Sequence, residues 1–294
     1  MIRFTKMHGC GNDYIYINGF TENVGNHSDA AVKLSNRHFG VGSDGLIFIN
    51  PSEKADFEME MYNLDGSRAQ MCGNGIRCVG KYVYDHGMTD KTVITVDTLA
   101  GVKTLDLKVS DGKVTEVTVD MGAPVTDPLQ IPVSAEFAGS KEKIINEAIT
   151  VGDSEYRVTC VSMGNPHAIV FIDCDECDIK LSEIGPLFEN HKAFPERINT
   201  EFVKVRDRKR IDMRVWERGS GETFACGTGA CASAVASVLN GFTEDEVTIR
   251  LQGGELRARW DRENGHVFLT GPAETVFEGT MENILEAKEN FPER

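Results

Sequence analysis

Two cysteines in this 294-residue sequence stand in settings that suit acid–base chemistry. Cys72 lies in Met-Cys-Gly-Asn-Gly and Cys226 in Ala-Cys-Gly-Thr-Gly, and each pentapeptide opens a stretch of helical character. A thiol in the first turn of a helix faces backbone N–H groups and the positive end of the helix dipole, which can lower the thiol pKa to roughly 3.5 to 7.5. We therefore expect two thiols that can become thiolates. The flanking glycines would let a carboxylate approach the same N–H groups.

The surroundings of the two cysteines recur in the same order along the chain. Asn12 lies 60 residues before the first cysteine and Asn165 lies 61 residues before the second (72 − 12 and 226 − 165). Gly87 and Gly241 each follow their cysteine by 15 residues (87 − 72 and 241 − 226), where a left-handed C-cap would end the helix. This spacing predicts two copies of one structural unit.

The elements around the cysteines indicate an α+β fold. Segment 226–240 contains no charged residue and is small or apolar on every face, which predicts a helix buried all round. Short loops between strands favour an antiparallel, barrel-like sheet wrapped around one central helix in each half. We expect domains at 1–122 and 123–272, with the tail 273–294 packing on the first. In the first half, runs rich in Ile, Val, Phe and Thr predict strands at 2–7, 13–18, 46–50, 57–63, 92–97, 102–109 and 113–120.

A pseudo-symmetric pair of thiols suits inversion of a stereocentre. If the halves pack about a pseudo-two-fold axis, Cys72 and Cys226 face each other across a cleft that holds the active site. Inverting the α-carbon of an amino acid requires one deprotonated base on one face and one protonated acid on the other. Two other interpretations stay open: both cysteines could be buried packing residues, or they could form a redox disulfide.

Composition excludes several classes of partner. The sequence has 46 acidic and 31 basic side chains and a net charge of −15, which repels phosphate backbones and anionic lipid surfaces, so no nucleic-acid partner is expected. No apolar run reaches the roughly 20 residues of a membrane span, and the start lacks the apolar core of a signal peptide. We expect a cytoplasmic protein with no membrane partner, and its eight cysteines are expected to be reduced.

Two further patterns are not interpreted as sites. Gly40-Val-Gly-Ser-Asp-Gly45 fits the spacing of a dinucleotide-binding turn, but it leads into a strand-like run instead of opening a helix. Cys174-Asp-Glu-Cys177 has metal-like spacing without a second ligand pair, so no metal is predicted. The other cysteines are expected to be packing residues: Cys10, Cys78, Cys160 and Cys231.

Several long strings resemble the diaminopimelate epimerase family, along nearly the whole chain. The resemblance implies two similar domains, each a β-barrel around a central helix, that interconvert LL- and meso-diaminopimelate for lysine synthesis without pyridoxal phosphate or any other cofactor. It also implies a homodimer. The strings are MHGCGNDY (7–14), GVGSDGLI (40–47), YNLDGSRAQMCGNGIRC (62–78), GNPHAIV (164–170) and WERGSGETFACGTGACA (216–232).

Carried over by position, the resemblance implies a set of catalytic residues. Cys72 and Cys226 would be the acid–base pair, assisted by His167 and Glu217. Glu217 lies nine residues before its cysteine, as Asn63 does (226 − 217 and 72 − 63), so the repeat places these two opposite each other.

The resemblance also implies the residues that bind substrate. Arginine suits a carboxylate because its planar fork donates two parallel hydrogen bonds, and Glu217 could accept from the distal ammonium group. Backbone N–H groups at Gly73, Asn74, Gly227 and Thr228 would hold the α-carboxylate. The side chains expected to read the distal amino-acid head are Asn12, Asn63, Asn165, Asn199, Glu217 and Arg218.

One departure and two rival functions accompany this interpretation. Where some relatives carry a glutamine, this chain has Gly45, which lies opposite Asn199 because each precedes its cysteine by 27 residues (72 − 45 and 226 − 199). Substrate contact at that corner would then depend on Asn199. The rivals are a proline or hydroxyproline racemase of the same fold, against which Arg218 and the asparagines argue, and a non-catalytic thiol switch.

Overall fold

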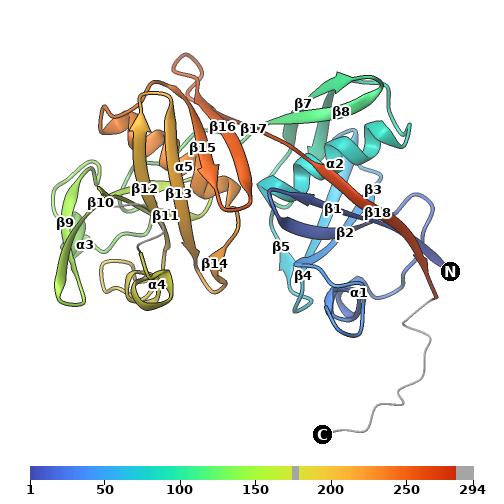
Figure 1. Cartoon of the computed structure of the whole chain (residues 1–294), viewed down its shortest axis with the longest axis horizontal. Helices are drawn as coiled ribbons and strands as arrows, with labels where there is room; N and C mark the ends of the chain where they lie inside the picture. Colours follow the sequence, from blue (N-terminus) through green and yellow to red (C-terminus); the bar gives the residue numbers. More distant parts are fainter. Residues whose placement is uncertain (174–178, 283–294) are drawn as a thin grey trace, which may run out of the picture. The chain divides into compact units, whose positions relative to one another are not determined.

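The computed structural model describes residues 1–173 and 179–282. The chain divides into two compact units (Figure 1). Of the described residues, the N-terminal unit comprises 1–117 and 272–282, and the C-terminal unit comprises those between 118 and 271. Each unit contains one of the two cysteines singled out above.

The N-terminal unit is a mixed sheet with two helices. Hydrogen bonds join the strands in the order β18-β1-β2-β3-β4, and β4 continues through β6 to β7. Its elements are β1 (Ile2–Gly9), β2 (Asn12–Asn18), α1 (His27–Ser35), β3 (Gly45–Asn50), β4 (Phe57–Asn63), β5 (Arg68–Ala69), α2 (Gly73–Asp85), β6 (Val93–Asp97), β7 (Lys103–Ser110), the first part of β8 (Lys113–Asp120) and β18 (Glu274–Met281).

The C-terminal unit repeats this arrangement. Its strands follow the order β9-β10-β11-β12-β13, and β13 continues through β15 to β16 and β17. The elements are α3 (Ala135–Ala138), β9 (Glu147–Val151), β10 (Ser154–Ser162), β11 (Pro166–Phe171), α4 (Leu181–Glu189), β12 (Asn199–Asp207), β13 (Arg210–Glu217), β14 (Gly221–Thr223), α5 (Gly227–Leu239), β15 (Glu246–Leu251), β16 (Gly254–Trp260) and β17 (Val267–Gly271).

The two units share their pairing pattern as well as their order. β2 pairs with β3 in parallel, as β11 does with β12, and the second parallel pair is β4–β6 in one unit and β13–β15 in the other. The other pairs named above are antiparallel. A helix lies in the connection within every parallel pair, as parallel strands require a long crossover. The duplicated α+β fold is confirmed, and the expected antiparallel pairing is corrected to a mixed sheet.

The predicted elements agree closely with the structure. All seven strand runs expected in the first half are present within one or two residues at each end. Both central helices also end as predicted: Gly87 and Gly241 have φ of 67° and 72°. Met88 N donates to Val83 O and Phe242 N donates to Ser237 O, so each helix closes with the same C-terminal motif.

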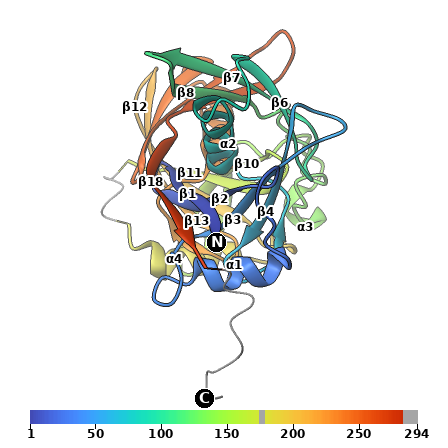
Figure 2. The same cartoon turned by 90° about the vertical axis from the view of Figure 1, so that its right-hand side faces the viewer.

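The central helices are enclosed by the strands of their own unit. α2 packs against β1, β2 and β7, and it lies among these strands in Figure 2. α5 packs against β10, β11 and β12 on one side and against β15, β16 and β17 on the other. Ten of its residues are buried, which matches the absence of charge in its sequence.

The C-terminal strand completes the sheet of the N-terminal unit. β18 pairs antiparallel with β1 from Ile2↔Met281 to His8↔Glu274, with a register shift between Lys6 and Met7. The backbone before this strand is fixed by a hydrogen bond of 3.2 Å from Arg77 Nε on α2 to the Pro272 carbonyl. Residues from opposite ends of the chain therefore build one sheet.

One sequence expectation is tested by the placement of a loop. Residues 40–44 of the glycine-rich segment form the loop between α1 and β3 and lead into a strand, unlike a dinucleotide-binding turn. Cys174 and Cys177 lie outside the described residues. Among the residues described, no helix has the length and apolar character needed to cross a membrane.

Candidate active site

Cys72 caps α2 and is held by polar groups of the N-terminal unit. The cysteine has extended backbone angles, and its sulfur accepts a hydrogen bond of 3.4 Å from Gly75 N. The thiol donates to Asn12 Oδ1 over 3.2 Å. Asn12 Nδ2 in turn donates to Asp44 Oδ2 over 2.8 Å. Because a carboxylate oxygen only accepts, Asp44 fixes the orientation of the Asn12 amide and keeps its oxygen toward the sulfur.

A buried arginine supports the same cluster from the helix side. Arg77 is fully buried, and its Nη2 donates to Asn74 Oδ1 over 2.9 Å. This bond directs Asn74 Nδ2 toward Asn12 Oδ1, 3.4 Å away. The Tyr14 hydroxyl lies beside Asn12 and Cys72, and burial followed by the nearby Cys72 raises the pKa of Tyr14 well above its usual range. The structure thus brings Asn12, Cys72 and Asn74 together as predicted.

Cys226 caps α5 in the same way but in a different electrostatic setting. Its sulfur accepts from Gly229 N and lies next to Thr228 Oγ1, both at 3.4 Å. Burial, the carboxylate of Glu217 and then that of Glu201 raise the pKa of this thiol well above its usual range. The prediction that the helix start would lower the thiol pKa is therefore wrong for Cys226, because burial and two neighbouring carboxylates outweigh the helix end.

His167 and Glu201 form a fully buried pair in the C-terminal unit. The ring Nδ1 lies 2.7 Å from Glu201 Oε1, and Nε2 lies 3.0 Å from Asn165 Oδ1. Since the amide oxygen only accepts, Nε2 carries a proton, and the bond between Nδ1 and Oε1 holds one more. Parallel pairing of β11 with β12 sets His167 opposite Asn199, two residues before Glu201.

Glu217 connects this pair to Cys226. The Thr223 hydroxyl donates to Glu217 Oε1. Burial raises the pKa of Glu217, while hydrogen bonds from Thr223 and Cys226 and the charge of His167 lower it in part. A carboxyl group with a raised pKa beside a thiol can exchange a proton with it. His167, Glu217 and Cys226 are therefore brought together as the sequence predicted.

The remaining predicted side chains lie at the edges of the two clusters. Asn199 is buried, donates to Pro166 O over 2.7 Å and accepts from Arg218 N over 2.9 Å. Its amide thus fixes the chain that carries Arg218, whose Nη1 donates to Glu196 O over 2.9 Å. Asn63 Nδ2 donates to Ser67 Oγ over 3.0 Å.

Two predicted features of the backbone are also present. Ile76 N and Ala230 N donate the first helical hydrogen bonds, to the carbonyls of Cys72 and Cys226. The N–H groups of Gly73, Asn74, Gly227 and Thr228 precede them and point out of the helix starts. Gly45 pairs with Tyr14 as Asn199 pairs with His167, so the correspondence between Gly45 and Asn199 is confirmed.

The sequence interpretation missed Glu201. Its position could have been found from the repeat, because Glu201 lies 25 residues before Cys226 and the apolar Ile47 lies 25 residues before Cys72 (226 − 201 and 72 − 47). A carboxylate that replaces an aliphatic side chain inside a strand is a signal of function.

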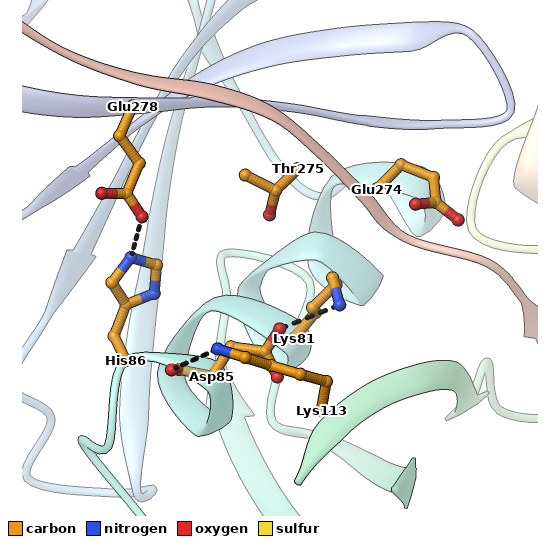
Figure 3. A pocket seen from close by; sticks show the side chains of 7 residues that line it. All are labelled: Lys81, Asp85, His86, Lys113, Glu274, Thr275 and Glu278. Carbon is orange, nitrogen blue, oxygen red and sulfur yellow. Dashed lines mark hydrogen bonds and ion pairs between the residues drawn. The ribbon is translucent and has the colours of Figure 1, made fainter. Parts of the chain in front are cut away.

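A cavity of about 320 Å³ in the N-terminal unit lies away from Cys72. It is found at the C-terminal end of α2, while the cysteine caps the other end of this 13-residue helix, roughly 20 Å away. Four of its charged side chains form two pairs, Lys81 with Asp85 and His86 with Glu278 (Figure 3). The lining residues are Lys81, Asp85, His86, Lys113, Glu274, Thr275 and Glu278.

Within the described part of the chain, no group of three His, Cys, Asp or Glu side chains is arranged to hold a metal ion.

The fold, with two repeated β units and a cysteine at the head of each central helix, is similar to that of several solved structures. A hydroxyproline epimerase from Agrobacterium vitis aligns with a TM-score of 0.66 at 15% identity, covering 95% of this chain and 90% of that one. A phenazine biosynthesis protein of the PhzF family from Bacillus anthracis aligns with a TM-score of 0.65 at 18% identity, covering 95% and 98%. At such identities the likeness shows the fold alone.

Sequence comparison gives the family. The family model for diaminopimelate epimerase matches residues 4–126 and 159–276. The diaminopimelate epimerase of Acetivibrio thermocellus is 58% identical over 282 residues, which cover 96% of this chain and 99% of the relative. That of Methanococcus maripaludis strain S2 is 52% identical over 281 residues, 96% of this chain and 100% of the relative. The chain belongs to the diaminopimelate epimerase family.

Proposed function

We propose that this protein interconverts LL- and meso-2,6-diaminopimelate by moving protons through Cys72 and Cys226. The observation that carries the proposal is the equivalent place of the two thiols, each capping the central helix of its unit. Family membership and relatives of the same name at 50% identity or more support the substrate. The reaction would serve lysine biosynthesis.

The proposed chemistry requires the two sulfurs to reach opposite faces of one α-carbon. The thiolate on one side removes the α-proton, which breaks a C–H bond and forms an S–H bond. The thiol on the other side gives its proton to the carbanion, which forms the new C–H bond and leaves a thiolate. Both proton-transfer groups come from the chain itself, so the proposal needs no cofactor.

The helix starts suit the carboxylate attached to the reacting carbon. The outward N–H groups at Gly73 and Asn74 on α2, and at Gly227 and Thr228 on α5, lie at the positive ends of the two helix dipoles. A carboxylate held there would also stabilise the negative charge that spreads onto it when the α-proton leaves. Glycine at the first position of each helix keeps the approach open.

The polar residues around the thiols are assigned to proton exchange or to substrate binding, and Glu217 is assigned to both. We assign Glu217, with support from His167, to proton exchange with Cys226, because Glu217 hydrogen-bonds to that thiol. Arg218 is assigned to the distal carboxylate and Glu217 to the distal ammonium group. The asparagines proposed to read the remaining polar groups are Asn12, Asn63, Asn165 and Asn199.

Solvent isotope exchange tests the reaction. In D₂O the purified protein should place deuterium at Cα of diaminopimelate and interconvert its LL and meso isomers. Exchange at Cα of proline without exchange at diaminopimelate would instead select a proline or hydroxyproline racemase.

Removal of either thiol tests the mechanism against a redox switch. We expect Cys72→Ala and Cys226→Ala each to abolish epimerisation, since every inversion uses both groups. An inert substrate analogue should still bind to each variant, with lower affinity than to the parent. Cys160→Ala is the matched control, because Cys160 is a buried thiol of β10 that takes no part in the proposed proton transfer. Epimerisation by both site variants at the parent rate would disprove the two-thiol mechanism.

We also propose that the protein works as a homodimer in the cytoplasm, as the family resemblance suggests. Light scattering of the purified protein at micromolar concentration checks the oligomeric state, with a mass near twice 32.4 kDa as the expected result.

A further inference from the structure

Glu201 is a buried carboxylate whose surroundings do not fully satisfy it. The side chain is fully buried, and Oε1 makes its bond of 2.7 Å with His167. Oε2 has no hydrogen-bond partner. Among the described residues it is one of only three buried side-chain polar atoms without one. Such atoms are costly, because a carboxylate oxygen withdrawn from water loses strong hydrogen bonds. Packing alone therefore does not explain this residue.

The other unit shows that the fold does not need a charge at this place. A Cβ built on Gly229 would lie 2.5 Å from Glu201 Oε1, and a Cβ built on Gly75 would lie 2.8 Å from Ile47 Cδ1. These two glycines occupy the same position, three residues after their cysteines. Glu201 and Ile47 thus fill equivalent space against the first turn of α5 and of α2. An aliphatic side chain is sufficient for packing there.

The carboxylate faces the start of α5 and the thiol that caps it. Glu201 is the side chain nearest to the Cβ position of Gly229, followed by Cys226 itself. The titratable groups that surround it come from three other strands and one helix: Cys160 on β10, His167 on β11, Glu217 on β13 and Cys226 on α5. The carboxylate of the His167–Glu201 pair therefore points at the helix start. There its negative charge counteracts the stabilisation that the positive dipole end would give to a thiolate at Cys226.

We propose that Glu201 is a positioning residue that keeps Cys226 in its protonated form, so that Cys72 supplies the resting thiolate of the pair. The proposal rests on the proposed two-thiol reaction and adds an asymmetry that the duplicated fold lacks. In the first half-reaction from this state, Cys72 takes the α-proton and Cys226 gives its own to the opposite face. The raised pKa of the Cys226 thiol, to which Glu201 contributes, agrees with this order.

Alkylation by iodoacetamide as a function of pH measures the two thiols separately. Cys226 is followed in a Cys72→Ala chain and Cys72 in a Cys226→Ala chain, with mass spectrometry of the labelled peptide. Glu201→Gln keeps the shape and removes the charge. With Glu201→Gln, we expect Cys226 to be alkylated roughly tenfold faster than with Glu201 at pH values below its pKa, equivalent to a fall of about one unit in that pKa. Cys72 should keep its alkylation rate. Glu201→Asp, which retains the charge, should stay within about threefold of the parent.

A second buried carboxylate of the same unit provides the control. Asp212 is 2% exposed and pairs with Arg206 and Arg250, so Asp212→Asn also removes a buried charge, but on a different set of partners. It should leave both alkylation profiles unchanged. Unchanged labelling of Cys226 in a folded Glu201→Gln chain, or equal acceleration of both thiols, would overturn the proposal.

The parent sequence gives a measurement that does not depend on the folding of Glu201→Gln. The proposal requires the alkylation midpoint of Cys226 to lie at higher pH than that of Cys72. Equal midpoints, or the reverse order, would reject it even if the parent epimerises diaminopimelate. Conversely, the midpoints can differ as expected in a protein without epimerase activity, which would reject the proposed function alone.

Discussion

At the scale of single residues, the two half-sites differ although their backbones match. Cys72 donates to an amide oxygen that Asp44 holds in place, whereas Cys226 lies beside two carboxylates. Arg77 has its counterpart in Cys231, since both lie five residues after their cysteine (77 − 72 and 231 − 226). The two thiols share their place at a helix start, and the side chains around them differ.

Gly229 should be intolerant of any side chain. In Gly229→Ala the new Cβ would lie 2.5 Å from Glu201 Oε1, which is buried and bonded to His167. We expect the free energy of unfolding to fall by about 1–3 kcal/mol, as for other overpacked sites. Urea denaturation measures it.

Gly75→Ala is the matched control for this substitution. Its Cβ meets Ile47 Cδ1 at 2.8 Å and Met59 Cε at 3.2 Å, which are the ends of flexible side chains that can move. The loss of stability should therefore be smaller than for Gly229→Ala. An equal loss at both positions would show that the Glu201 contact has no special cost.

At the scale of elements, the two central helices solve the same packing problem with different sequences. α2 presents Lys81 and Asp85 as an ion pair of 2.8 Å near its end, while α5 carries no charge at all. Small side chains let strands pack against α5 on every side, and ten of its residues are buried.

Ala234 of α5 should not accept a larger side chain. It is 1% exposed in the middle of the helix, so Ala234→Leu forces three additional carbon atoms into space that strands already fill. We expect a loss of about 1–3 kcal/mol in the free energy of unfolding. Leu239→Met, a volume-conserving change at the half-buried end of the same helix, should cost less than about 1.5 kcal/mol. Urea denaturation compares them, and a smaller loss for Ala234→Leu than for Leu239→Met would contradict the packing described.

At the scale of the whole molecule, buried thiols make stability depend on alkaline pH. Burial raises the pKa of Cys78 to about 12 and raises those of Cys160 and Cys226 as well. A group whose folded-state pKa is raised stabilises the fold fully below its unfolded pKa, near 8.5 for a thiol, and loses this contribution as pH rises toward the folded value.

Unfolding should therefore become easier above about pH 8.5. Each thiol that stays protonated only in the folded state costs about 1.4 kcal/mol per pH unit in this window. A chain with Cys78→Ala and Cys160→Ala should lose roughly 3 kcal/mol less than the parent between pH 7.5 and 9.5. Thermal unfolding at the two pH values measures the difference. An identical decline in both chains would mean that other groups, such as the buried tyrosines, account for it.

The sequence by itself determined the duplicated plan, the two cysteines that cap the central helices, the family and the strand limits of the first half. These features depend on local spacing, on turn glycines and on apolar periodicity, all of which are written along the chain. Even the correspondence of Gly45 with Asn199 followed from counting residues.

Only the tertiary structure decided what surrounds each thiol. Glu201 reaches Cys226 because parallel pairing sets β12 beside β11 and because Gly229 leaves room for the carboxylate. The parallel pairs and the place of β18 beside β1 likewise join segments distant in sequence. The pKa of Cys226 depends on burial and on the charges of Glu217 and Glu201, which two different strands bring to the thiol. The local sequence at a helix start does not contain this information.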